Sequence, residues 1–128
     1  MRAEESKPVE GEQMEEECLR RHDLVIVGGG VTGMTAGIYA ARARVDAVLV
    51  EAMIAGGQLI NADIIENFPG FPDGIQATDL VGMMEKQAKR FGLEFVRAKV
   101  ELLQPREDDF LLQTTAGDIC AKAAIICT

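Results

Sequence analysis

Apolar residues along the first half of the chain form two short continuous runs with a helix-like repeat between them. Residues 24–27 are apolar and mostly β-branched without alternation, which is typical of a strand buried on both faces of a parallel sheet. Residues 32–44 follow with helical spacing and several small side chains, and residues 47–50 form a second buried run. This order of strand, helix and strand predicts an α/β fold built on a parallel sheet.

A second helix and further strands are predicted downstream. Residues 78–90 have helical spacing, with Thr78 or Asp79 as the N-cap and Gly92 as the terminator. Residues 93–96 are expected to form the third strand of the parallel sheet. A small antiparallel β-meander and then a return to the parallel sheet are predicted from the runs near residues 100–103, 110–115, 118–121 and 124–127.

Three glycines between the first predicted strand and its helix have the spacing of a dinucleotide-binding turn. Gly28 permits the tight turn off the strand, Gly30 lets a pyrophosphate approach the backbone, and Gly33 allows close packing of the helix. The start of the helix offers N–H groups and a positive dipole end to phosphates. The alternative is a strand-to-helix turn that binds nothing, but the flanking strand and helix favour the nucleotide site.

Glu51 ends the second predicted strand about 20 residues after Gly30, where dinucleotide-binding folds place an acid that binds ribose hydroxyls. A carboxylate there repels a 2′-phosphate, and the next two residues supply no arginine. The sequence therefore predicts a site for FAD or NAD rather than NADP. The residues expected to bind the cofactor in this unit are Gly28, Gly29, Gly30, Val31, Thr32, Gly33, Glu51 and Ala52.

The segment from residue 52 to 77 is a long connection of about 25 residues without clear periodicity, and such loops are often functional. Its first motif, Gly56-Gly57-Gln58-Leu59, combines close backbone approach with an amide that both donates and accepts hydrogen bonds. Its second motif, around Asn67, adds another amide, two aromatic rings and two prolines. These loops are suited to a flat heteroaromatic ring, and the alternative is a proline-stiffened surface turn.

Composition describes a globular domain with an acidic extension. The chain has 128 residues, 48% of them hydrophobic and 27% charged, with no apolar run near the ~18 residues that a membrane span requires. Much of the net charge of −8 comes from residues 1–17, and residues 1–22 are expected to be an acidic, disordered tail. The tail resembles neither a signal peptide nor a transit peptide, so we expect a cytoplasmic protein. The acidic balance argues against nucleic-acid binding.

The three cysteines, Cys18, Cys120 and Cys127, show neither a CxxC motif nor metal-ligand spacing. We expect free thiols in a reducing compartment, no metal site, and Cys127 as a small buried hydrophobe in the last strand. His22, the single histidine, precedes the first predicted strand and is expected to be exposed, without a catalytic partner.

The motifs together resemble the FAD-binding domain of the low-molecular-weight thioredoxin reductases and their close flavoprotein relatives. The resemblance covers residues 23–128 and implies that the bound dinucleotide is FAD. It implies that Glu51 binds the adenosine ribose and that the backbone of Val100 meets the adenine. It further places Gly57, Gln58 and Asn67 along the flavin half, and Gly56 and Leu59 are also expected to bind the cofactor. Thr128 matches the threonine of the family's Ala-Thr-Gly step, where the chain returns to the cofactor.

The activity implied by the resemblance is electron transfer from NAD(P)H through FAD to a disulfide. The implied partners are a thioredoxin-like protein or another disulfide acceptor, and a second copy of the chain in a homodimer. No residue of this chain is expected to be catalytic, because the nicotinamide site and the cysteine pair lie beyond Thr128 in the family.

Because the chain stops at Thr128, inside a motif, we expect an FAD-binding domain that is incomplete at the C-terminus and belongs to a longer protein. Two other functions remain open at this point. One is a stand-alone nucleotide-binding module or a truncated remnant without catalysis. The other is part of a ferredoxin-NADP reductase-like flavoprotein, a related branch that lacks the disulfide.

Overall fold

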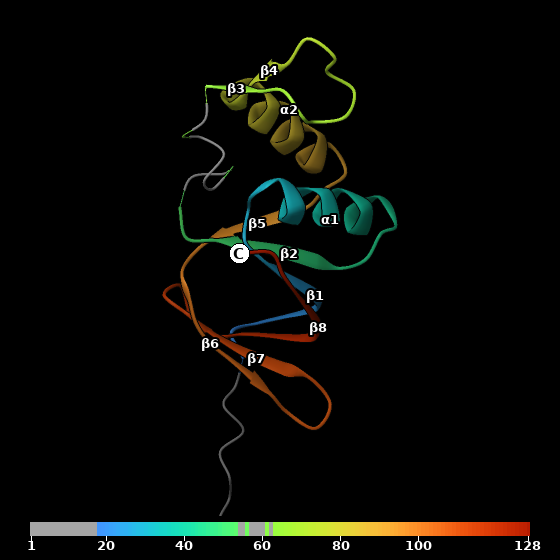
Figure 1. Ribbon diagram of the computed structural model, residues 1–128. Helices are drawn as coiled ribbons and strands as arrows, with labels where there is room; N and C mark the ends of the chain where they lie inside the picture. The colour runs from blue at the N-terminus through green and yellow to red at the C-terminus, as the bar shows by residue number, and fades with distance from the viewer. Residues whose placement is uncertain (1–17, 54–55, 57–60, 62) are drawn as a thin grey trace, which may run out of the picture.

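A six-stranded sheet in the order β5-β2-β1-β8-β7-β6 organises the part of the chain that the structure describes (Figure 1). We describe it from a computed structural model that covers residues 18–53, 56, 61 and 63–128. The parallel strands are β1 (Arg20–Val27), β2 (Ala47–Glu51), β5 (Glu94–Arg97) and β8 (Ile119–Ile126). The antiparallel strands are β6 (Val100–Pro105) and β7 (Phe110–Thr114). The predicted α/β fold, a parallel sheet with a small antiparallel addition, is confirmed.

Both helices lie on one side of the sheet, and a two-stranded sheet lies beyond them (Figure 1). Helix α1 (Val31–Arg42) connects β1 to β2, and α2 (Ala77–Arg90) leads into β5. The small sheet consists of β3 (Ile64–Ile65) and β4 (Ile75–Gln76), which pair antiparallel immediately before α2.

The side chains of the parallel strands divide between two buried clusters. Ile26 and Leu49 pack with the helices, whereas Val25 and Val48 pack on the opposite face with residues of the β6–β7 hairpin and β8. All four side chains are fully buried. Burial on both faces explains why these runs are continuously apolar rather than alternating.

The predicted helices and strands up to residue 97 agree with the structure to within a few residues. Gly92 ends α2 with a φ of 85°, a conformation that glycine adopts without strain. The N-cap of α2 is Gln76 rather than Thr78 or Asp79, because β4 leads directly into the helix.

The prediction of two separate strands at residues 118–121 and 124–127 is wrong. The structure has one strand, β8, whose first part pairs antiparallel with β7 and whose whole length pairs parallel with β1. No turn residue separates the two apolar runs, so the chain continues straight between Cys120 and Ile125. On one side, β8 pairs with β1 along its length. On the other side, its pairing with β7 ends at Ala121.

The predicted boundary of the acidic tail at residue 22 is also wrong. Strand β1 begins at Arg20, where its backbone pairs with Ile119, and His22 pairs with Ala121. The side chain of His22 is 9% exposed and its Nδ1 lies 2.9 Å from Asp46 Oδ1, so the prediction of an exposed histidine fails. These polar residues lie in the sheet because they pair in parallel with β8, a strand distant in the sequence. The expected disorder of residues 1–17 lies outside the described residues.

The prediction of three free thiols holds only for Cys127. Cys18 and Cys120 are joined by a disulfide with a Cα–Cα distance of 5.7 Å across a sequence separation of 102. Parallel pairing puts the start of β1 beside the start of β8, with Arg21 opposite Cys120, and Cys18 reaches Cys120 from before the bend at Leu19.

Candidate functional site

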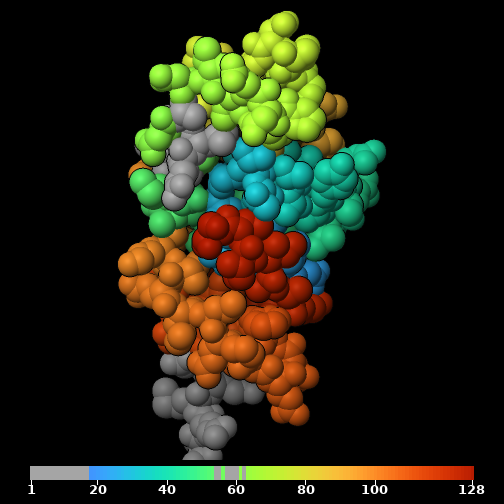
Figure 2. Space-filling view, viewed as in Figure 1, coloured from blue at the N-terminus to red at the C-terminus, as the bar shows by residue number. Residues whose placement is uncertain are grey.

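A cleft of about 560 Å³ lies where the carboxyl ends of β1 and β2 meet the start of α1. The last residues of the chain reach the same place, and the C-terminus lies beside the start of α1 (Figure 1). Figure 2 shows these C-terminal residues, in red, on the visible face between α1 and the β6–β7 hairpin. Open parallel sheets bind ligands at this edge, outside the carboxyl ends of the strands.

The glycine turn forms one wall of the cleft and leaves no room for side chains at two positions. Gly28 has a φ of 109°, and its N–H donates to Val50 O at 2.9 Å. A Cβ there would overlap the carbonyl group of Cys127, and a Cβ at Gly33 would overlap the carbonyl oxygen of Gly28. These two glycines therefore keep β1, α1 and the end of β8 in close contact.

Gly30, in contrast, has open space beside it, because a Cβ at this position would meet no atom within 4 Å. It is the N-cap of α1, and Met34 N donates to its carbonyl at 2.9 Å. The first turn of α1 contains no acidic residue and no side-chain cap. The N–H groups of this turn thus face open space at the positive end of the helix, an arrangement that binds phosphate.

The carboxylate of Glu51 closes the second side of the turn. Its Oε2 accepts a hydrogen bond from Gly29 N at 2.5 Å, and its Oε1 accepts one from Met53 N at 2.9 Å. Gly56 N donates to Gly29 O at 2.9 Å, which ties the loop after β2 to the glycine turn. Because a carboxylate has about four acceptor positions, Glu51 can also accept from two ribose hydroxyls.

Backbone hydrogen bonds fix the remaining walls. Ala98 N donates to Glu51 O at 3.0 Å, which sets the segment after β5 against the end of β2. Cys127 N donates to Val27 O at 2.7 Å and so holds the end of the chain beside the glycine turn. Lys99 and Val100 complete the rim, with the exposed Lys99 as a cation next to the cleft.

Most of the sequence-predicted site residues come together here. Those that line the cleft are Gly28, Gly30, Val31, Thr32, Glu51, Ala52, Gly56, Val100 and Thr128. Gly29 and Gly33 lie behind them as hydrogen-bonding and packing residues. Gly57, Gln58 and Leu59 lie outside the described residues.

Several lining residues were not predicted, and all of them lie at or just beyond the carboxyl end of a parallel strand. They are Val27, Val50, Met53, Ala98, Lys99 and Cys127. The sequence did contain a signal for these residues. Ligands bind at the carboxyl ends of parallel strands, so the residues at each predicted strand end were candidates for lining the cleft. Cys127 is half-buried rather than fully buried, because it lies beyond the end of β8 at the cleft.

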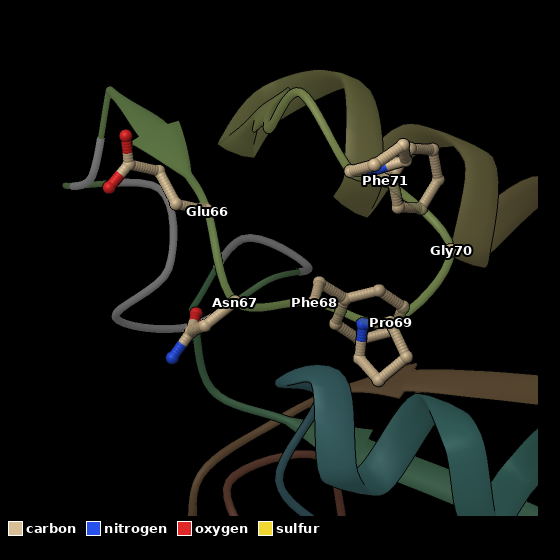
Figure 3. A pocket seen from close by; sticks show the side chains of 7 residues that line it. Glu66, Asn67, Phe68, Pro69, Gly70 and Phe71 are labelled. Carbon is tan, nitrogen blue, oxygen red and sulfur yellow. The ribbon is translucent and has the colours of Figure 1, made fainter.

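Asn67 is not among the residues that line the cleft. It belongs to a second hollow of about 500 Å³ formed by residues 66–72 (Figure 3). The side chains of Glu66 and Asn67 project to one side of this loop, and the rings of Phe68 and Phe71 to the other. The two rings pack with centroids 6.1 Å apart and help cover the helix-side cluster.

Other kinds of site are not found among the residues that the structure describes. No group of three or more histidine, cysteine or acidic side chains there could hold a metal ion. No helix within the described ranges is long and apolar enough to cross a membrane.

Comparison with known proteins decides the family. Residues 22–128 match the family described as "Pyridine nucleotide-disulphide oxidoreductase". The chain belongs to this family. It is 42% identical over 110 residues to "NADPH-dependent thioredoxin reductase 3" of Arabidopsis thaliana, a match covering 83% of this chain and 21% of that protein. It is 40% identical over 108 residues to a thioredoxin reductase of Chlamydia trachomatis, covering 82% of this chain and 35% of the other.

Solved structures of family members have the same fold. The crystal structure of Lactococcus lactis thioredoxin reductase superimposes with a TM-score of 0.80 and 33% identity, over 84% of this chain and 35% of that one. The thioredoxin reductase of Streptococcus pyogenes gives a TM-score of 0.81 at 33% identity with the same coverage. The chain thus spans about a third or less of the relatives that it matches. The resemblance to thioredoxin reductases expected from the motifs is confirmed.

Proposed function

We propose that this chain is the FAD-binding portion of a longer NAD(P)H-dependent oxidoreductase that passes electrons through FAD to a disulfide. The observation that carries the proposal is the cleft beside Gly30, where the uncapped start of α1, the Glu51 carboxylate and the end of the chain meet around open space. Its shape and chemistry suit the adenosine and pyrophosphate of a dinucleotide.

Each wall of the cleft takes one part of the cofactor in this proposal. The pyrophosphate lies against the backbone of Gly30 and the first turn of α1, where N–H groups donate to its oxygens. Glu51 accepts from the ribose hydroxyls, and the backbone of Val100 binds the adenine edge. Gly57, Gln58 and Asn67 are assigned to the flavin half, and Thr128 to the approach of the chain beside it.

FAD, when bound, supplies the redox chemistry by accepting and passing on an electron pair, while the protein supplies position and electrostatics. We assign NAD(P)H as donor and a thioredoxin-like protein or another disulfide as acceptor, because the similar proteins named above are thioredoxin reductases. These names also favour the thioredoxin reductase branch over a ferredoxin-NADP reductase-like flavoprotein. A homodimer and a cytoplasmic location remain predictions from the sequence.

A binding experiment with a matched pair of glycine variants tests the cofactor assignment. Neither Gly30 nor Gly82 has an atom within 4 Å of an added Cβ, so both Gly30→Ala and Gly82→Ala should fold. Only the methyl group at residue 30 points into the proposed pyrophosphate position. In calorimetry with FAD and with ADP, we expect Gly30→Ala to bind at least about tenfold more weakly, a loss of about 1.4 kcal/mol. Gly82→Ala should bind like the unmodified chain.

Two results would contradict the assignment. One is equal affinity of Gly30→Ala and the unmodified chain for FAD. The other is a folded, monodisperse chain that binds neither FAD nor ADP.

The proposed activity is tested on the longer protein. We expect it to reduce a thioredoxin with NADPH or NADH and to show the visible absorption of bound flavin. A flavin-containing protein that reduces ferredoxin but no disulfide would overturn the thioredoxin reductase assignment and leave the FAD site intact.

A further inference from the structure

A second chemically reactive cluster lies at the opposite end of β8 from the cleft. Cys120 is near the start of β8, whereas Cys127 and Thr128, which line the cleft, follow its end. Cys18 precedes β1 and reaches Cys120 at a Cα–Cα distance of 5.7 Å, within the range that a disulfide bridges without moving the backbone. The pair therefore makes and breaks its bond without a change of fold.

Arg106, in the turn between β6 and β7, extends its guanidinium group to both sulfurs. Its Nη2 lies 3.0 Å from Cys120 Sγ and 3.9 Å from Cys18 Sγ. A guanidinium group at this distance stabilises a thiolate and lowers the pKa of the thiol. Since it stabilises the reduced, charged form, it also makes the disulfide easier to reduce.

Asp109 and Arg21 extend the charged cluster around Arg106. Asp109 accepts two hydrogen bonds from Arg106, to Oδ1 and Oδ2, each at 2.6 Å, and these fix the guanidinium in place. The hydrogen bond from Arg106 lowers the pKa of Asp109, so this carboxyl is ionised at neutral pH. Arg21 Nη1 lies 3.5 Å from Asp109 Oδ2 and adds a second positive charge.

The two sulfur positions differ in their access to solvent. Cys120 is 1% exposed, whereas Cys18 is half-buried. An external thiol or disulfide therefore reaches Cys18 first, and Cys120 is placed to act second from within the sheet.

We propose that Cys18 and Cys120 form a reversible redox site that exchanges with low-molecular-weight disulfides. In the oxidising direction, the Cys18 thiolate attacks one sulfur of an external disulfide RSSR, forming a mixed disulfide and releasing one RS⁻. The Cys120 thiolate, beside Arg106, then attacks Cys18 Sγ and releases the second RS⁻. The two thiol protons of the protein end on the two RSH molecules. RSSR is reduced by two electrons as the protein dithiol is oxidised, and reduction reverses these steps.

Oxidation at this site fastens the start of β1 to the start of β8. The closed loop contains most of the chain, since the cysteines are separated by 102 positions. Cross-linking over so long a loop restricts the unfolded chain strongly, so we expect oxidation to raise the thermal unfolding midpoint by about 10 °C. The site uses no residue of the cleft and does not depend on the proposed FAD function.

Thiol trapping in glutathione buffers tests the proposal. The reduced 128-residue chain is equilibrated with mixtures of reduced and oxidised glutathione, quenched with acid, and alkylated in denaturant for mass spectrometry. We expect Cys18 and Cys120 to lose alkylation together within the range of these buffers, while Cys127 stays alkylated. In Cys120→Ser, a glutathione adduct should accumulate on Cys18.

Variants of Arg106 separate a redox site from a merely structural cross-link. Arg106→Gln should raise the pH midpoint of Cys18 or Cys120 alkylation and slow oxidation at neutral pH by about threefold for each unit of pKa. Arg106→Lys, which keeps the charge, should restore most of the rate. Arg20→Gln is the matched control, because Arg20 Nη1 pairs with Glu94 Oε1 at 2.6 Å, and it should change neither value.

Three outcomes would overturn the proposal. A pair that stays oxidised in every glutathione buffer is a permanent structural disulfide. A pair that stays reduced in every buffer is no redox site. Equal alkylation midpoints and oxidation rates in the unmodified chain, Arg106→Gln and Arg106→Lys would show that Arg106 activates neither thiol, and the pair would then be an ordinary structural cross-link.

Discussion

The two faces of the parallel sheet are packed by different means. On the helix face, close approach depends on small residues, because Gly33 abuts the carbonyl of Gly28 and Gly37 abuts Leu93. On the face of the β6–β7 hairpin, branched residues such as Val48 and Ile119 fill the space with their own bulk. The cleft sits at the edge of the helix face, so the same glycines that admit the helix also shape the glycine turn. Both faces contribute to the cleft, since Val27, Val50 and Ala98 of the hairpin-face cluster also line it. Only on the helix face do the residues that permit close packing, the glycines, also form the turn itself.

The largest expected effect comes from removing one large side chain from each face. Leu49 on the helix face and Leu112 on the hairpin face are both fully buried, so Leu49→Ala and Leu112→Ala should each lose about 2–5 kcal/mol of unfolding free energy. Urea unfolding measures the loss, with Leu102→Ala, exposed by 45%, as a near-neutral control. Two separate unfolding transitions in either variant would show that the faces are independent units.

A methyl group at Gly33 should affect both stability and binding. Because its Cβ would overlap the backbone oxygen of Gly28, Gly33→Ala should lose about 1–3 kcal/mol, as overpacked sites do. It should also weaken ADP binding, since the turn must move. Chemical denaturation and calorimetry measure the two effects. A variant with unchanged ADP affinity would separate the packing of α1 from the geometry of the site.

Gly37→Ala tests the second close contact of a glycine on the helix face. Its Cβ would meet Cδ2 of Leu93, the end of a flexible side chain, so we expect a loss below about 1 kcal/mol and no change in ADP affinity. The double variant Gly37→Ala/Leu93→Ala should lose less than the sum of the single variants, because the new methyl fills part of the space that Leu93 leaves. Strict additivity in the double-mutant cycle would contradict this contact.

The smallest expected effect is a gain. Gly82 is exposed in the middle of α2 with open space around it, so Gly82→Ala should stabilise the chain by about 0.5–1 kcal/mol through helix propensity. Thermal unfolding should show a higher midpoint. An unchanged midpoint would mean that α2 contributes little to the stability of the folded unit, and a decrease would mean that the methyl group is not accommodated at this position.

Local patterns were sufficient for the elements whose partners are close in sequence. The span of α1, the run of β2 and the end of α2 at Gly92 follow from periodicity and glycine positions, because each depends on neighbouring residues. The glycine turn with Glu51 was predictable for the same reason, since a strand, a turn and a helix position these residues together.

Predictions failed where a residue's environment depends on a distant strand. Residues 118–127 were predicted to form two strands, but they form one strand that continues past the end of its pairing with β7. The sequence of β8 does not show where that pairing ends. His22 was expected to be exposed, but Asp46 and the extension of β1 bury it. Asn67 lies in the hollow of residues 66–72 and not in the cleft, so its place along the flavin half stays a prediction.

The amino-acid sequence by itself determined the βαβ unit, the glycine turn and the acid at residue 51, because each follows from short-range geometry. The meeting of Cys18 with Cys120 depends on the tertiary structure. Parallel pairing between β1 and β8 joins residues about a hundred positions apart, and it brings the start of β1, with Cys18 just before it, to Cys120 and Arg106. The same pairing carries Thr128 to the glycine turn, so one long-range contact organises both ends of β8.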